Sequence, residues 1–509
     1  MLVQPHMRIT VSSHNFAVSR LSARGRGLCN KFATRFIAWD WKNTGGRYTK
    51  VPTKVFASAT KDRNHYRFHI TALDEFKQLL AENDCTGSLV EWIEYTPYEA
   101  VSAVFKVKEG WIPHDYQIPV IEYLSGPIPI GKIAELATGK GKSICALLAI
   151  SNIGKRVVGV IRPQYLQKWI DDFKKTFEDF DNEIVVVRGS GQLMKLLDLA
   201  REDRITSKAI LISSTTLRNW IVEYENASEE ILDLGYACTP YNLFEYLGAG
   251  VRLIDECHQD FHFYFKLDTY TNIPTSISLS ATLINNDAFI EKMYNVMFPL
   301  NQRMVKMDLD KYIDSHAVHF NFKSVDHIRT EEYGSSTYSH MAVEKSIIRH
   351  IPTLLNYFRL VDYVLQLSYF RDKKPGEKAI VFAASIDMCT RMTNYFKEKY
   401  PDLDIRRYVE DDPYENVLEA DIRFTTIGSG GTAIDIDKLS CAIMTTAILS
   451  EQANVQACGR LRKRPDGKTE FYYFCADDIP KHLNYHSAKR EMLNHRAKSF
   501  RDIYSGHRV

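Results

Sequence analysis

Residue types that bind phosphate stand close together between Ile130 and Ile150, in the run IGKIAELATGKGKSICALLAI. The apolar residues up to Leu136 predict a strand, a glycine-containing loop follows, and Lys142 and Ser143 open a predicted helix. Backbone N–H groups of such a loop can bind an anion, while the lysine reaches phosphates and the serine hydroxyl holds Mg²⁺. Because Leu136 stands where the G-x-x-x-x-G-K-[ST] pattern has glycine, a plain Gly/Lys turn is the alternative.

Two carboxylates, Asp255 and Glu256, follow an apolar run in the segment VRLIDECHQ. The carboxyl end of a strand is where an α/β sheet places groups that contact ligands. One carboxylate beside the serine hydroxyl can complete a Mg²⁺ site, and the other can activate a water that attacks phosphate. Alone, the pair would indicate a solvated strand end. Cys257 and His258 could bind a metal, but no partner ligands lie nearby in the sequence.

A basic cluster lies near the C-terminus, where QACGRLRKRPDG places four cations within the five positions from Arg460 to Arg464. Such a cluster is either a solvated turn or a group of side chains aimed at an anion.

The elements that must position these residues are short apolar runs alternating with helical stretches. The first set, between residues 128 and 298, comprises IGKIAEL, RVVGVIR, EIVVVR, KAILISS, VRLIDE and SISLSAT. The second set follows a weakly patterned stretch around 300–316 and comprises AVHFNF, KAIVFA, DIRFTTI, AIMTTA and FYYFCA. Nearly continuous apolar character is typical of strands covered on both faces, so two α/β domains with parallel sheets are predicted. A polar loop is predicted at 329–340 and a basic helical tail from about 481.

The N-terminal segment is basic: residues 1–70 carry thirteen lysines and arginines against two acidic residues, although the whole chain has a net charge of +2. Residues 1–105 are predicted to form a small α+β domain. Its aromatic residues are Phe16, Phe32, Phe36, Trp39, Trp41 and Tyr48. Basic and aromatic side chains together suit phosphate attraction and base stacking, although the aromatics alone could be the domain's core. We expect nucleic-acid binding here, with Arg24, Arg26 and Arg35 as candidate contacts.

Composition predicts a folded, multidomain protein, because 45% of the 509 residues are hydrophobic and 25% are charged. No apolar run is long enough to cross a membrane and no secretory signal is visible, so we expect a cytoplasmic location, in the host if the source is viral. The nine cysteines form no CxxC pair and no His/Cys cluster with zinc spacing, which predicts reduced thiols.

The chain resembles superfamily 2 helicases of the DExH group, because motifs of that family occur in order between residues 113 and 464. DECH and the later Ser280-Ala281-Thr282 resemble motifs II and III. PHDYQ resembles the adenine-reading element, VIRPQYLQKW motif Ia, ISSTTL a motif that touches the nucleic-acid backbone, TTIGSGGTAIDIDKL motif V and QACGRLRK motif VI. The resemblance implies two tandem RecA-like domains, at 106–300 and 301–509, which close on ATP and Mg²⁺.

The resemblance also implies roles for matched positions. The ATP-binding residues would be Tyr116, Gln117, Thr138, Gly139, Lys140, Gly141, Lys142 and Ser143, and Ser143 with Asp255 would hold Mg²⁺. Glu256 would activate water, and Gln456, Arg460 and Lys463 would reach the γ-phosphate from the second domain. His258, Ser280 and Thr282 would couple the ATP site to the strand, and Pro163, Thr216, Thr432 and Asp435 would contact DNA. Ala433 and Lys463 depart from the family's glycine and arginine, so Arg462 or Arg464 could serve as the second finger.

Length, the basic first domain and the leucine that begins the P-loop are most similar to phage UvsW-type branch-migration and fork-remodelling helicases. The implied function is an ATP-dependent DNA helicase that unwinds or branch-migrates forked and junction DNA in recombination, repair or replication. A double-stranded DNA translocase without strand separation, an RNA helicase and an ATP-switched clamp are the alternatives. Expected partners are branched, forked and single-stranded/duplex junction DNA and single-strand-binding or recombination proteins, with a monomer and no membrane.

Overall fold

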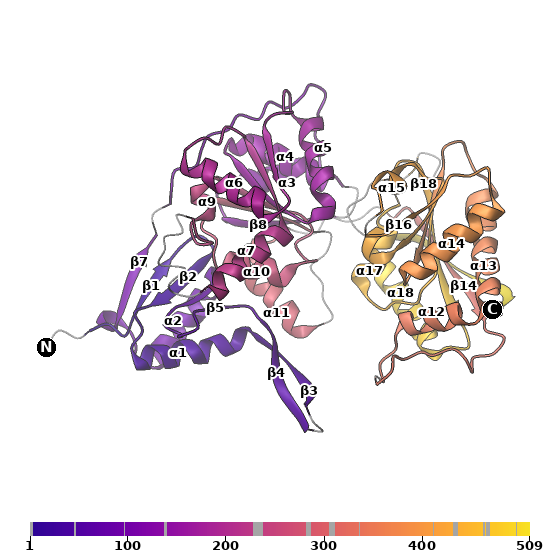
Figure 1. Ribbon diagram of the computed structural model, residues 1–509, viewed down its shortest axis with the longest axis horizontal. Helices are drawn as coiled ribbons and strands as arrows, with labels where there is room; N and C mark the ends of the chain where they lie inside the picture. The colour runs from indigo at the N-terminus through magenta and orange to yellow at the C-terminus, as the bar shows by residue number, and fades with distance from the viewer. Residues whose placement is uncertain are drawn as a thin grey trace. The chain divides into compact units, whose positions relative to one another are not determined.

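Each of two units carries a parallel β-sheet in this computed structural model (Figure 1). The first unit lies within residues 1–306 and the second within residues 307–509. The structure describes residues 4–44, 47–95, 97–136, 140–227, 238–280, 287–304, 311–334, 336–410, 412–430, 436–461, 464, 469–494 and 496–509.

The N-terminal segment folds into a mixed sheet covered by helices α1 (Ala23–Ala33) and α2 (Leu73–Glu82). The sheet order is β5-β6-β2-β1-β7. Its strands are β1 (Met7–Val11), β2 (Asn15–Ser19), β5 (Ser58–Ala59), β6 (Tyr66–His69) and β7 (Val90–Glu94). Phe16, Phe32 and Phe36 are buried between the sheet and the helices. For these three aromatic residues the alternative prediction, a place in the domain's core, is confirmed.

The remaining aromatics of the basic segment lie on a separate two-stranded ribbon. Its strands, β3 (Ile37–Thr44) and β4 (Arg47–Val55), pair antiparallel and extend away from α1 (Figure 1). Trp39, Trp41 and Tyr48 are 44%, 63% and 70% exposed. These three side chains therefore lie outside the core. The basic segment thus has buried aromatic residues that form its core and exposed ones on the ribbon.

The first parallel sheet has the order β10-β11-β9-β12-β13-β8, and every pairing in it is parallel. Its strands are β8 (Gly131–Glu135), β9 (Val157–Ile161), β10 (Ile184–Val187), β11 (Ala209–Ser213), β12 (Val251–Ile254) and β13 (Thr275–Ser280). The helices are α3 (Ile118–Ser125), α4 (Lys142–Ile153), α5 (Leu166–Thr176), α6 (Ser190–Arg201), α7 (Ser214–Asn226), α9 (Leu243–Tyr246), α10 (Phe261–Asp268) and α11 (Ala288–Met297). The predicted strands and the parallel topology are confirmed.

The N-terminal elements pack against this sheet's helices and share its hydrophobic core. The ring centroids of Phe56 and Phe265 lie 5.1 Å apart. Nε2 of His69 lies 3.3 Å from Oδ2 of Asp268, whose other oxygen is 2.5 Å from the guanidinium of Arg252. Burial would raise the pKa of Asp268, but the charge of Arg252 and the hydrogen bond with His69 outweigh it and hold that pKa below its usual value. The predicted boundaries at 105 and 300 stay a prediction.

The second parallel sheet has the order β16-β17-β15-β18-β19-β14-β20. Its strands are β14 (Ile313–Asn321), β15 (Lys378–Ala383), β16 (Ile405–Tyr408), β17 (Ile422–Thr426), β18 (Leu439–Met444), β19 (Glu470–Ala476) and β20 (Ala497–Arg508). The helices include α12 (His340–Arg349), α13 (Ile351–Leu365), α14 (Ile386–Lys399), α15 (Glu415–Glu419), α17 (Glu451–Cys458) and α18 (Pro480–Leu493). The five apolar runs predicted as strands lie in β14, β15, β17, β18 and β19.

The C-terminal tail is helical only as far as Leu493, in α18, and the prediction of a wholly helical tail is wrong beyond it. Residues 497–508 form β20, which pairs parallel with β14 at the edge of the sheet. Helical propensity is weak enough to be overridden when a sheet edge offers backbone hydrogen bonds, and that edge is supplied by residues far away in sequence.

No helix in the described part of the chain is long and apolar enough to span a membrane. All nine cysteines are free and buried, in agreement with the prediction of reduced thiols.

Candidate functional site

The predicted phosphate-binding and carboxylate residues lie at one edge of the first parallel sheet. Because β12, β13 and β8 are neighbours and parallel, their carboxyl ends meet there. Gly141 precedes α4 with φ +78°, in the left-handed region. The backbone therefore favours glycine, and a Cβ there would lie 2.3 Å from Nε2 of Gln117 and displace that side chain.

Lys142, at the start of α4, forms a buried ion pair with Glu256, which follows β12. Nζ of Lys142 lies 2.7 Å from Oε1 of Glu256, and the side chains are 10% and 5% exposed. Glu256 has φ +48°, an uncommon conformation for a residue with a side chain, and its N–H donates to Oδ1 of Asp255 at 3.0 Å. The strand end therefore directs both carboxylates toward the start of α4.

Ser143 and Asp255, the predicted Mg²⁺ ligands, are bridged by the ammonium group of Lys168. Nζ of Lys168 donates to Oγ of Ser143 at 2.7 Å and lies 3.7 Å from Oδ2 of Asp255. Burial would lower the pKa of Lys168, but Asp255 and Asp172 outweigh it and raise that pKa. A cation thus already lies between the two oxygens, so this donor set suits a hard divalent cation such as Mg²⁺.

Trp169, next to Lys168 on α5, holds the same carboxylate oxygen of Asp255. Its buried indole Nε1 donates to Oδ2 of Asp255 at 2.9 Å. Sequence reasoning did not single out Lys168 or Trp169, although both lie within the quoted VIRPQYLQKW run. They could have been found from topology, because α5 follows β9, the strand next to β12.

His258 and Ser280, the predicted coupling residues, join the ends of β12 and β13. Nδ1 of His258 lies 2.8 Å from Oγ of Ser280 and 3.5 Å from Oε2 of Glu256. Burial lowers the pKa of His258 to about 4, so the ring is neutral at pH 7. A neutral ring has one donor and one acceptor nitrogen, which ties its hydrogen bonding to the carboxylate beside it. Thr282 lies outside the described residues.

Gln117 and Tyr116 lie beside the loop before α4. Oε1 of Gln117 accepts from the N–H of His114 at 3.0 Å, and its Nε2 donates to the carbonyl of Lys140 at 3.1 Å. Nζ of Lys140 lies 5.2 Å from the ring centroid of Tyr116. The structure therefore gathers the predicted adenine-reading residues near the predicted phosphate loop. Two further predicted positions, Thr138 and Gly139, lie outside the described residues.

Pro163 and Thr216, both predicted to contact DNA, line one cavity of about 450 Å³. Pro163 follows β9, and Thr216 lies in α7 after β11. Arg188, which follows β10, lines the same cavity. Three adjacent strand ends thus form a concave site with a cation, at the carboxyl edge of the sheet.

The second unit carries the remaining predicted catalytic residues. Gln456 lies in α17, although its side chain is outside the described part, and the buried Arg460 follows that helix. Arg464 forms an ion pair with Glu377 and donates to the carbonyl of Lys438. That Gln456, Arg460 or Arg464 contacts a phosphate held by the first unit stays a prediction. Lys463, Thr432 and Asp435 lie outside the described residues.

The predicted N-terminal DNA contacts are exposed but already have protein partners. Arg26 donates to Asn64 at 2.6 Å, and Arg35 lies 3.1 Å from Glu75. Arg24 donates to a backbone carbonyl at Asn83.

The β3–β4 ribbon and its aromatic face were not predicted from the sequence. Trp41 lies directly opposite Lys50, and Trp39 opposite Pro52, so these side chains share one face of the ribbon. Residues 43 and 48 are also opposite, which adds the exposed Tyr48 ring to the same face.

Comparison with known proteins gives one family match. Residues 113–285 match the model described as type III restriction enzyme, res subunit. No curated protein matches the chain significantly.

Solved structures give matches in fold. S. cerevisiae Dbp5 bound to RNA and ADP BeF3 aligns at 12% identity and a TM-score of 0.50, covering 76% of this chain and 89% of its own. Mss116p bound to ssRNA and AMP-PNP aligns at 14% identity and a TM-score of 0.50, covering 75% and 74%. T4 UvsW aligns over 98% of this chain and 99% of its own at 12% identity, but its TM-score of 0.34 carries no weight for the finer assignment. Residues 113–285 are therefore similar to the res subunit of type III restriction enzymes, and the two parallel-sheet units have a tandem RecA-like fold.

Proposed function

We propose that this protein is an ATP-dependent DNA helicase or translocase that unwinds or branch-migrates forked and junction DNA. The observation that carries the ATPase part is the convergence of Lys142, Ser143, Asp255 and Glu256 at one sheet edge. Two segments far apart in sequence there supply a phosphate-binding cation, a hydroxyl and two carboxylates.

The chain's own residues have separate tasks in this proposal. ATP with Mg²⁺ supplies the γ-phosphoryl group and neutralises charge on its oxygens. Lys142 binds phosphate, while Ser143 and Asp255 hold the metal ion. Glu256 accepts a hydrogen bond from the attacking water and orients it. Because Glu256 pairs with Lys142, phosphate binding at the lysine would release the carboxylate for this task.

Arg460 and Gln456 of the second unit are proposed to contact the γ-phosphate when the domains close, with Lys463 nearby. A cation placed there stabilises charge that develops during phosphoryl transfer, which couples hydrolysis to domain movement. His258 and Ser280 would relay the state of Glu256 toward the bound strand.

Two surfaces are proposed to hold nucleic acid. The cavity at Pro163 and Thr216 offers concave shape and the guanidinium of Arg188, which suits a phosphate backbone. The ribbon offers the exposed rings of Trp41 and Tyr48 beside Lys50, and stacking of bases on such rings tolerates any sequence. One surface would bind the phosphate backbone and the other would stack unpaired bases. A fork offers both features.

One experiment tests the proposal: ATP hydrolysis and strand separation measured side by side on fork, four-way junction, D-loop and RNA hybrid substrates. We expect DNA to stimulate hydrolysis and forked DNA to be unwound. Stimulation by RNA but not by DNA would contradict the DNA assignment. Absence of hydrolysis with every substrate would contradict the ATPase assignment.

Double-stranded DNA translocation without strand separation is the second candidate. The restriction-enzyme family match over residues 113–285 favours it. It predicts stimulation of hydrolysis by blunt duplex DNA and displacement of a bound triplex strand, with no unwinding of the fork.

A further inference from the structure

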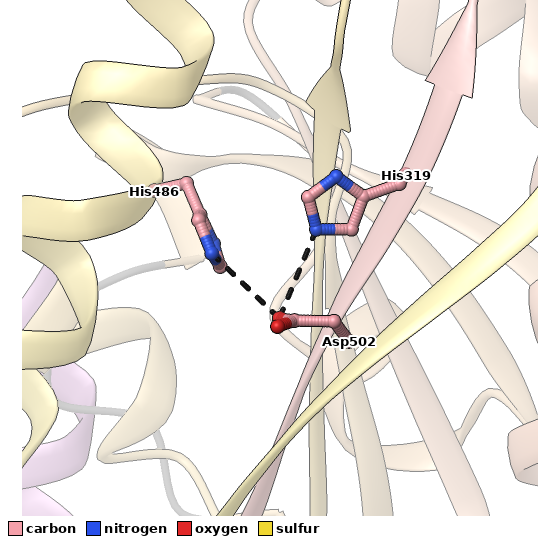
Figure 2. Close-up of side chains that lie close together, drawn as sticks. All are labelled: His319, His486 and Asp502. Carbon is pink, nitrogen blue, oxygen red and sulfur yellow. Dashed lines mark ion pairs between the residues drawn. The ribbon is translucent and has the colours of Figure 1, made fainter.

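Three side chains that the proposed ATP and DNA sites do not use converge in the second unit (Figure 2). His319 lies on β14, His486 on α18 and Asp502 on β20. Nε2 of His319 lies 3.7 Å from Oδ1 of Asp502, and Nε2 of His486 lies 3.6 Å from the same oxygen. We propose that these three atoms bind a divalent first-row metal ion, Zn²⁺ or a close relative, which fastens α18 and β20 to the sheet.

The distances fit metal ligands better than hydrogen bonds. Separations of 3.6 and 3.7 Å exceed the usual hydrogen-bond range of about 2.7–3.2 Å. Tetrahedral zinc with bonds of about 2.0–2.1 Å places neighbouring ligand atoms roughly 3.4 Å apart. All three ligand atoms lie within 4.8 Å of one another, so a small approach of the side chains would complete three corners of that tetrahedron.

Two of the three ligand atoms are buried and lack a hydrogen-bond partner among the described residues. These atoms are Nε2 of His319 and Oδ1 of Asp502. The His319 side chain is only 6% exposed, so bulk solvent does not reach its nitrogen. A buried polar atom without a partner is costly, and a metal ion would satisfy both atoms together.

The far nitrogen of each imidazole is held by a second partner. Nδ1 of His319 lies 2.6 Å from Oδ1 of Asp477, and Nδ1 of His486 lies 2.9 Å from the hydroxyl of Tyr473. A carboxylate or hydroxyl on the outer nitrogen fixes the ring orientation and leaves Nε2 for the metal, as in carboxylate–histidine–zinc sites.

The carboxylate is oriented in the same way. Oδ2 of Asp502 accepts from Arg490 at 3.3 Å, which leaves Oδ1 facing the two histidines. The guanidinium of Arg490 and the buried amine of Lys489 are the nearby basic groups on α18.

A second combination, His319 with Cys475 and Asp477, fits a metal less well. Its 2.6 Å contact between Nδ1 and the carboxylate is a hydrogen bond, too short for two ligands of one ion.

The test uses untagged full-length protein stripped with a chelator and then titrated with Zn²⁺ against a chromophoric indicator. We expect one equivalent per chain, and a visible Co²⁺ spectrum of the intensity that four-coordinate sites give. His486→Gln and Asp502→Asn should each weaken Zn²⁺ binding by more than about 100-fold, because changing even an outer partner costs about 10–100-fold. Asp477→Asn changes such an outer partner, so its loss of Zn²⁺ affinity should be about 10–100-fold.

His482→Gln is the matched control, because His482 is a buried histidine on the same helix that contacts Tyr338 instead. It should bind Zn²⁺ as the wild type does and show the same rise in melting temperature with the metal. Absence of stoichiometric binding by the wild type would overturn the proposal. Wild-type affinity in both His486→Gln and Asp502→Asn would overturn it equally, whatever their stability.

Discussion

Nζ of Lys142 and Oε1 of Glu256 lie 2.7 Å apart, so the lysine predicted to bind phosphate and the carboxylate predicted to activate water hold each other. The pair lies between the start of α4 and the end of β12. A phosphate that binds Lys142 competes with this carboxylate, which links nucleotide binding to the position of the water-orienting group. Under the proposed function, the pair would give a physical reason for ATP hydrolysis to follow ATP binding.

Glu256→Gln should abolish hydrolysis while ATP and DNA still bind. The amide keeps the shape but loses the charge and basicity that orient and activate water, and such groups contribute about 10²–10⁴-fold to rate. Steady-state turnover and fluorescent nucleotide titration measure the two effects. Undiminished turnover would contradict the role given to Glu256.

Lys168→Met should lower the Mg²⁺ concentration that gives half-maximal hydrolysis by a few fold. The ammonium lies between Ser143 and Asp255, so it competes with a metal ion for the same oxygens. The measurement is a Mg²⁺ titration at fixed total ATP. Lys174→Met on the same helix, whose ammonium pairs with Asp181 instead, is the control and should not shift the curve. A higher Mg²⁺ requirement in Lys168→Met would show that the lysine assists the metal.

Trp41→Ala with Tyr48→Ala should weaken fork DNA binding by about tenfold or more, since stacking contributes about 1–3 kcal/mol per base. Both rings are exposed and outside the core, so folding should be unaffected. Fluorescence anisotropy measures the affinity. Trp92→Ala is the matched control, because that ring is also exposed but lies on β7. An equal loss of affinity in the double variant and in Trp92→Ala would contradict a role of the ribbon in DNA binding.

Arg464→Ala should lower stability more than turnover per folded molecule. The guanidinium already pairs with Glu377 and bonds to Lys438 within its own unit, which favours a structural role over that of the second finger. Lys463→Ala should then reduce turnover without the same loss of stability. Thermal melting and ATPase assays on both variants compare the two. A collapse of turnover confined to Arg464→Ala would reverse the assignment.

The free energy of unfolding should fall as the pH falls from about 7 to 5.5, partly through His482. Burial lowers the pKa of His482 to about 4, whereas an exposed histidine titrates near 6.5. The unfolded chain therefore binds more protons in this window, and the loss is about 1 kcal/mol for this group. Urea unfolding at both pH values should show a smaller loss in His482→Gln. The same loss in both would contradict this contribution.

The sequence by itself determined the parallel architecture and the sheet edge that carries the candidate ATP site. Continuous apolar runs are explained by strands buried on both faces, and a strand followed by Lys142-Ser143 or by Asp255-Glu256 places those groups at a carboxyl end. Such arguments succeed because they depend only on neighbours in the chain and on the handedness of the crossover.

Only the tertiary structure decided which distant residues meet. β20 became a strand because β14 offers an edge, and His319, His486 and Asp502 converge because that edge brings the tail beside α18. The phenylalanines of the basic segment are buried and Trp41 is exposed, although their local sequences differ little in character. Lys168 reaches Asp255 because β9 and β12 are neighbours in space, and long-range packing of that kind leaves no local pattern in the sequence.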